Sequence, residues 1–151
     1  MAAARKVLLV AEGTTLSKES LLCALNLCQR TCSELVVLNV VACPREHTYW
    51  ADVHRRLVRE RLAEAARRID PLLEEARAQG VALTLVRREG DTESALSELA
   101  RSQGGLVAVV ATEPAASPSA SRARCAAPLR RAVERIQALF GCPLVAVKAR
   151  K

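Results

Sequence analysis

The chain is poor in aromatic residues and has no long hydrophobic run. Its only aromatic residues are Tyr49, Trp50 and Phe140, too few for a surface on which bases stack, and no known DNA- or RNA-binding motif is present. The first apolar run, Val7 to Ala11, is five residues long, which is too short for a membrane span or a signal peptide. We therefore expect a cytoplasmic protein that binds neither nucleic acid nor a membrane.

Histidine is also scarce, which bears on catalysis. His47 and His54 are the only two, and both fall in or beside an expected surface loop, so a nucleophile–histidine pair is not favoured. A response-regulator receiver would need an aspartate after its third strand, where this chain has Arg87, Arg88 and Glu89. These absences lead us to expect that the protein is not an enzyme.

Glycine is the third deficit, with six in 151 residues and none between Leu106 and Phe140. A P-loop needs a glycine-rich run that ends in Gly-Lys-Ser or Gly-Lys-Thr, and a dinucleotide-binding fold needs three glycines after its first strand. The chain has neither pattern. These two common phosphate-binding motifs are therefore excluded.

Six cysteines are present, but a disulfide framework is typical of short secreted chains without a proper core. We therefore expect reduced thiols. Cys28 and Cys32 are four residues apart on an expected helix and could share a metal ion, but no third ligand stands at a suitable spacing. They continue the apolar stripe of Leu21 and Leu25, so we interpret both as core residues.

The features that are present favour one globular domain over residues 1–151. Half of the residues are hydrophobic, and this length supports a single core. The net charge of +7 comes mainly from arginine. Much of that arginine alternates with glutamate on one face of a long helix, a pattern that is normally solvated surface.

Five short apolar runs alternate with helical patterns. Strands are expected over residues 6–11, 34–42, 81–87, 106–111 and 143–147, and helices over 17–31, about 50–79, a segment capped by Asp91, and 128–141. Pro71 should kink the second helix or start another. Residues 112–127, rich in Ala, Ser and Pro, should form a long loop. The strict alternation predicts an α/β fold, a parallel sheet with helices on both faces and any ligand beyond the carboxyl ends of its strands.

Four phrases, in order and nearly from end to end, resemble the universal stress protein family. They are the opening strand and turn at 6–14 with Ser17, the strand at 34–41, the Gly-Asp pair at 90–91, and the ending Cys-Pro-Leu-Val-Ala-Val at 142–147. The resemblance implies an adenine nucleotide alpha hydrolase-like fold with a five-stranded sheet in the order 3-2-1-4-5. It also implies a homodimer formed through strand five, with the interface residues Leu144, Val145, Ala146 and Val147.

The chain departs from this family at the phosphate site. Members that bind ATP carry Gly, two residues, Gly, nine residues, then Gly-Ser or Gly-Thr after strand four. Residues 111–114, Ala-Thr-Glu-Pro, stand near the first two glycines, and Arg130 and Arg131 stand at the last pair. A Cβ atom at these points blocks the backbone approach that a phosphate nest needs. Glu12 also replaces the family's aspartate after strand one. The vestigial nucleotide pocket that the resemblance implies comprises Glu12, Gly13, Val41, Gly90, Arg130 and Arg131.

Two functions from different classes follow. The first is a non-enzymatic stress-response or signalling module, homodimeric, without ATP or another cofactor, which acts through contacts with a protein partner that the sequence does not identify. The alternative is a sensor of a nucleotide or other small anion. Its pocket would be lined by arginines near the carboxyl edge of the sheet, namely Arg87, Arg88, Arg122, Arg124, Arg130 and Arg131.

Overall fold

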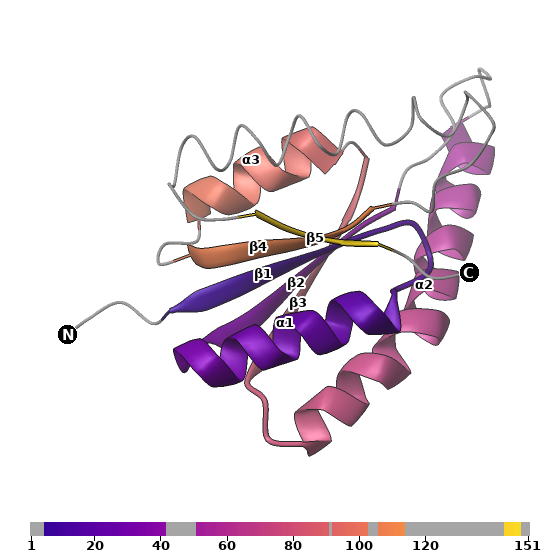
Figure 1. The fold of residues 1–151 in the computed structure, drawn as a ribbon. Helices are drawn as coiled ribbons and strands as arrows, with labels where there is room; N and C mark the ends of the chain where they lie inside the picture. The colour runs from indigo at the N-terminus through magenta and orange to yellow at the C-terminus, as the bar shows by residue number, and fades with distance from the viewer. Residues whose placement is uncertain (1–4, 42–50, 91, 103–105, 114–143, 149–151) are drawn as a thin grey trace.

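The predicted five-stranded parallel sheet is confirmed. The computed structural model describes residues 5–41, 51–90, 92–102, 106–113 and 144–148, and Figure 1 shows their arrangement. The strands lie in the order β3-β2-β1-β4-β5, and all neighbouring pairs are parallel. Their bounds are β1 Lys6–Glu12, β2 Glu34–Val41, β3 Leu83–Glu89, β4 Leu106–Glu113 and β5 Leu144–Lys148.

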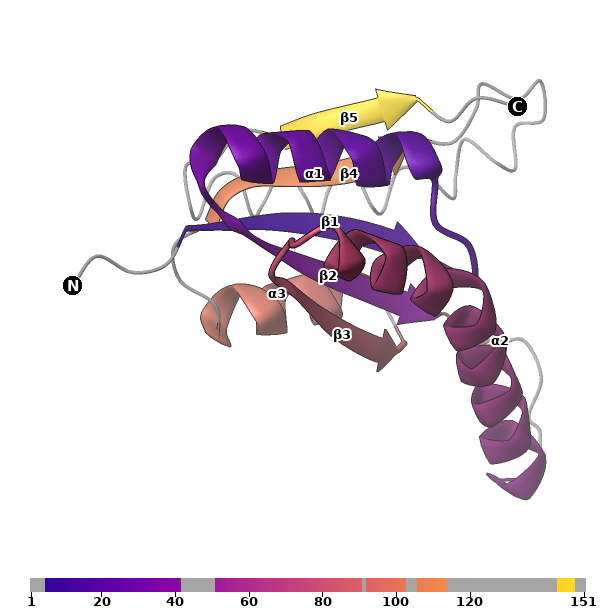
Figure 2. The ribbon, with the colours of Figure 1, turned by 90° about the horizontal axis from the view of Figure 1, so that it is seen from below.

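Three helices lie within the described residues, and they cover both faces of the sheet as predicted. They are α1 Lys18–Thr31, α2 Ala51–Ala78 and α3 Thr92–Ser102. Figures 1 and 2 show α1 and α2 on one face and α3 on the other. The expected helix over 128–141 and the cap at Asp91 lie outside the described residues.

The core has two layers because successive side chains of a strand point to opposite faces. In β1, Val7 and Leu9 pack towards α1 and α2, whereas Leu8 and Val10 pack towards α3. All four are buried to 98% or more. A sheet that is covered by helices on each side buries both faces of its strands, which is why the sequence shows continuous apolar runs.

The ends of α1 show why one of the two cysteine interpretations was wrong. Ser17 caps the helix, as its Oγ accepts a hydrogen bond from the backbone N–H of Ser20. Cys28 is buried as expected, and burial raises the pKa of its thiol to about 11. Cys32 is exposed. It stands past the last helical residue with a φ of +51°, and this left-handed cap conformation takes it off the apolar stripe.

Two observed features also differ from those expected from the sequence. A second helix does not begin at Pro71, since α2 runs through it as one element; packing of the apolar face on the sheet outweighs the loss of one backbone donor. The expected loop starts later than residue 112, because Thr112 and Glu113 belong to β4 and pair with β5. The rest of that loop lies outside the described residues. No helix in the described segments is long and apolar enough to cross a membrane.

The layer under α2 generates a stability prediction. Ile69 is fully buried in it, so Ile69→Ala should lower the free energy of unfolding by about 2–5 kcal/mol, because it leaves a cavity. Urea denaturation followed by circular dichroism measures this. Leu22→Ala is the control, since Leu22 is 60% exposed on α1, and it should change the value by less than about 0.5 kcal/mol. Equal losses in the two variants would contradict this packing.

Candidate functional site

The structure brings four of the predicted pocket residues to one edge of the sheet. Glu12 ends β1, Gly13 follows it, Val41 ends β2 and Gly90 follows β3. The backbone N–H of Gly13 donates to the carbonyl oxygen of Val40 at 2.8 Å, and that of Gly90 donates to the carbonyl oxygen of Val41 at 3.0 Å. The end of β2 is therefore bonded to the turns that follow both of its neighbours, β1 and β3.

Both glycines are needed for the backbone conformation. Their φ angles are +81° for Gly13 and +121° for Gly90, a region that side chains with a Cβ atom rarely adopt. Nothing lies within 4 Å of the position that a Cβ would take at either residue. Conformation and not lack of space therefore explains glycine at these two turns.

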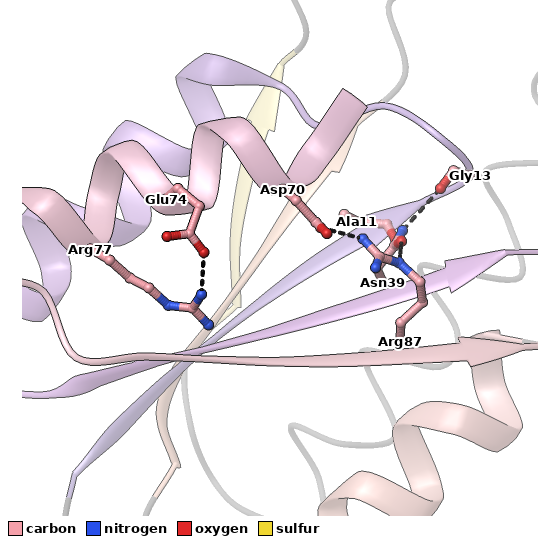
Figure 3. Close-up of polar contacts among 7 residues, drawn as sticks. All are labelled: Ala11, Gly13, Asn39, Asp70, Glu74, Arg77 and Arg87. Atoms are coloured by element: carbon pink, nitrogen blue, oxygen red, sulfur yellow. Dashed lines mark hydrogen bonds and ion pairs between the residues drawn. The ribbon is translucent and has the colours of Figure 1, made fainter. Parts of the chain in front are cut away.

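The centre of this edge is Asn39, a buried polar residue in the middle of the apolar strand β2. Its Nδ2 donates to the carbonyl oxygens of Ala11 at 3.0 Å and Gly13 at 2.9 Å. Its Oδ1 accepts a hydrogen bond from Nε of Arg87 at 2.8 Å. Figure 3 shows that the carboxamide lies between the turn after β1 and the guanidinium from β3. Asn39 thus fixes the Glu12–Gly13 turn through hydrogen bonds to the carbonyl oxygens on either side of Glu12.

Arg87 extends this network to α2. Its Nη2 donates to Oδ1 of Asp70 at 2.8 Å, and the Arg87 side chain is only 18% exposed. A guanidinium removed from water in this way needs an anionic partner, and Asp70 supplies one. Arg87 lies at the carboxyl edge as predicted, but two of its donors are engaged within the protein and do not face outward.

Strand register explains why these residues meet. Ala11 is the partner of Asn39 in the β1–β2 pairing, and Asn39 is the partner of Arg87 in the β2–β3 pairing. The three residues therefore form one row across the sheet, on the face that α2 covers. The row two residues earlier, Leu9, Val37 and Leu85, is apolar. The polar row marks where the core ends and the carboxyl edge begins.

The chemical groups that this edge offers are few. Glu12 is exposed, whereas the side chain of Val41 is 1% exposed and packs in the core, so only the backbone of Val41 faces the edge. No group of three His, Cys, Asp or Glu residues among those described could hold a metal ion. Of the described arginines in the predicted anion pocket, Arg88 is exposed and Arg87 is engaged by Asn39 and Asp70.

The other predicted site residues lie away from this edge network or outside the described residues. Arg130 and Arg131 lie outside the described residues, and so do Arg122 and Arg124. The predicted interface residues Leu144, Val145, Ala146 and Val147 lie in β5, which is an edge strand of the sheet as expected.

Asn39 and Asp70 were not among the site residues predicted from the sequence. A signal for Asn39 exists, because it is the single polar residue inside the run Leu35 to Val41. Such a residue, buried in a central strand, must find hydrogen-bond partners. Asp70 carries no comparable signal, since an acidic residue on a charged helix is ordinary.

Comparison with known proteins agrees with this architecture. No protein-family model and no curated protein sequence matches the chain. Among solved structures, it is similar to the universal stress protein UspA from Lactobacillus plantarum, with a TM-score of 0.64 and 16% identity over 97% of this chain and 99% of that one. A universal stress protein in complex with cAMP matches with a TM-score of 0.56 and 13% identity, over 99% of this chain and 100% of the other.

A third similar structure is a universal stress family protein from Arabidopsis thaliana with AMP bound. Its TM-score is 0.53 at 15% identity, over 97% of this chain and 92% of that chain. Each match spans nearly the whole length of both proteins, which confirms the fold expected from the sequence phrases. The chain therefore has the universal stress protein fold.

Proposed function

We propose that this protein is a non-enzymatic stress-response or signalling module that acts through protein contacts and does not bind ATP in the manner of its nucleotide-binding structural relatives. The observation that carries the proposal is the internal bonding at the carboxyl edge. The carbonyl oxygens of Ala11, Gly13, Val40 and Val41 all accept hydrogen bonds from the protein itself. A ligand at this edge would find these backbone groups already engaged.

The sequence after β4 supports the same proposal. A phosphate nest needs backbone N–H groups that a ligand can approach closely, which glycine allows and a Cβ atom obstructs. There is no glycine from residue 106 to residue 140. The two halves of a nucleotide site, one for the base and ribose and one for phosphate, would therefore both be impaired.

The alternative is a sensor of a nucleotide or another small anion. Two of the similar structures hold AMP and cAMP, and arginine can bind phosphate through paired hydrogen bonds without a glycine-rich loop. Arg88 is exposed at the end of β3. Arg130 and Arg131 would supply the other charges if this function holds.

Isothermal titration calorimetry separates the two functions. We expect ATP with magnesium to bind weakly or not at all, because the glycine positions are filled. A low-micromolar dissociation constant would overturn the proposal.

The sensor function predicts instead that AMP binds, and that Arg130→Ala/Arg131→Ala weakens the binding of AMP by about 1.5–3 kcal/mol per lost charged hydrogen bond. Unchanged affinity for AMP in that double variant would show that Arg130 and Arg131 do not form the anion pocket.

Asn39 provides a test of the internal bonding. Asn39→Leu keeps the size of the side chain but removes the partners of Ala11, Gly13 and Arg87. The free energy of unfolding should fall by about 3 kcal/mol, because buried polar groups are left unsatisfied. Urea denaturation gives the value, and Asn26→Leu at an exposed position of α1 is the matched control. If the free energy of unfolding falls no more in Asn39→Leu than in the control, the hydrogen bonds of Asn39 do not stabilise the carboxyl edge.

We also expect a homodimer formed through β5. This strand lies at the edge of the sheet, where unpaired backbone groups can pair with a second copy. Four apolar residues precede its only charged one, Lys148. Light scattering at micromolar concentration should therefore give about twice the chain mass of 16.3 kDa. A mass equal to that of one chain would contradict the dimer.

Two proline variants test the location of the dimer contact. Neighbouring residues of a strand point their amides to opposite edges, so Val145→Pro and Ala146→Pro each remove a different donor. One of them should weaken pairing with β4 and the other should dissociate the dimer while the chain stays folded. A dimer that persists undiminished in both variants, with each still folded, would place the interface elsewhere.

A further inference from the structure

The first half of α2 extends beyond the sheet. From Val53 to Glu64 no residue is buried, whereas Ala65, Ile69 and Leu73 further along the same helix are. Figure 2 shows this part of α2 running past the carboxyl end of β3. We call residues 53–64 the projecting half of α2. Within it, only Leu62 of the described side chains is recorded as packing against the core, and Leu62 is itself only half-buried.

Arg55 and Arg59 stand out on this projecting half. Arg55 lies seven residues before Leu62, and Leu62 lies seven before Ile69, so the three share one side of the helix. Ile69 is buried, Leu62 is half-buried and Arg55 is exposed. The side of α2 that packs on the sheet continues along the projecting half through the half-buried Val58, and Arg55 and Arg59 lie beside it, one turn apart.

Neither of these two arginines is neutralised by a charged group among the described residues. Arg56 pairs with Glu60 at 3.8 Å, and Arg68 pairs with Glu64 at 3.2 Å. Within the described segments, Arg55 and Arg59 make no ion pair and no side-chain hydrogen bond. Glu60 and Glu64, the two glutamates of the projecting half, are thus paired with other arginines, and the exposed guanidinium groups of Arg55 and Arg59 remain available to an external carboxylate.

A contact with β3 fixes where these groups stand. His54 Nε2 lies 3.8 Å from Glu89 Oε1, which joins the start of α2 to the last residue of β3. With the Arg87–Asp70 pair further along the helix, α2 is attached to the end of β3 at two points. The start of the projecting half therefore lies beside the last residue of β3, at the carboxyl edge of the sheet.

The composition of the projecting half favours a protein partner. It has four arginines and two glutamates, and α2 as a whole contains no lysine. Arginine is enriched and lysine depleted at protein interfaces. Val53 is 40% exposed and would add apolar contact.

We propose that the projecting half of α2 is a docking surface for an acidic segment of a partner protein, with Arg55 and Arg59 as its charged contacts. The planar guanidinium group binds a carboxylate through two parallel hydrogen bonds, so a segment rich in Glu or Asp is the complementary chemistry. This inference rests on the proposed function, because it supplies the surface and the kind of partner for a module that acts through protein contacts.

Fluorescence anisotropy with a labelled oligoglutamate peptide at low ionic strength tests this surface. Arg55→Ala/Arg59→Ala should weaken binding about five-fold or more, as two exposed charge pairs are lost. The matched control is Arg30→Ala/Arg101→Ala. It removes the same charge from exposed arginines in the last turns of α1 and α3, which precede the starts of β2 and β4 at the opposite edge of the sheet. The control should stay within about two-fold of the unmodified protein.

Three results would overturn the docking surface. They are absence of peptide binding to the unmodified protein, an equal loss in the two variants, and tighter binding of a single-stranded DNA oligonucleotide that depends on Arg55 and Arg59. Circular dichroism confirms that each variant is folded. The proposed function fails separately, since tight ATP binding in calorimetry would overturn it and leave the peptide result unaffected.

Discussion

The buried carboxamide of Asn39 is the constraint on which the carboxyl edge of this protein depends. An asparagine side chain has two N–H donors and a carbonyl acceptor, and burial makes any unused one costly. Both N–H groups bond to carbonyl oxygens of the β1 turn, and the carbonyl accepts from Arg87. Arg87 in turn requires Asp70. One polar residue in an apolar strand thereby joins three strands and a helix.

This arrangement relates the fold to the two proposals. In an α/β sheet the carboxyl edge is the usual place for a ligand, because the turns there present backbone groups. Here those groups bond to one another and to Asn39. Arg55 and Arg59, which are exposed and make no ion pair among the described residues, lie on α2, which projects past the same edge. Because the backbone groups of the edge are bonded and these arginines are not, we favour a function at the surface of α2 over one at the carboxyl edge.

Much of the fold could be predicted from the sequence, and the errors have physical causes. Continuous apolar runs predicted all five strands to within two residues at every boundary, because a strand covered on both faces is apolar along most of its length. Pro71 did not start a second helix, which was one of the two outcomes expected for it, and Cys32 did not pack in the core. In each case a local rule was outweighed by its surroundings, burial of the α2 face for Pro71 and the helix cap for Cys32. Neither effect is visible in local sequence.

The candidate site was predictable only in part. The turns that hold Gly13 and Gly90 follow from the sequence, since strand ends and glycines can be located along the chain. The network around Asn39 does not, because Ala11 is 28 residues and Arg87 is 48 residues away from it in the chain. Periodicity identifies which residues of a strand share a face, but the pairing register decides which residues of neighbouring strands form one row. The sequence by itself therefore determined the elements and the fold class, and the tertiary structure alone decided that Ala11, Asn39 and Arg87 meet beneath Asp70.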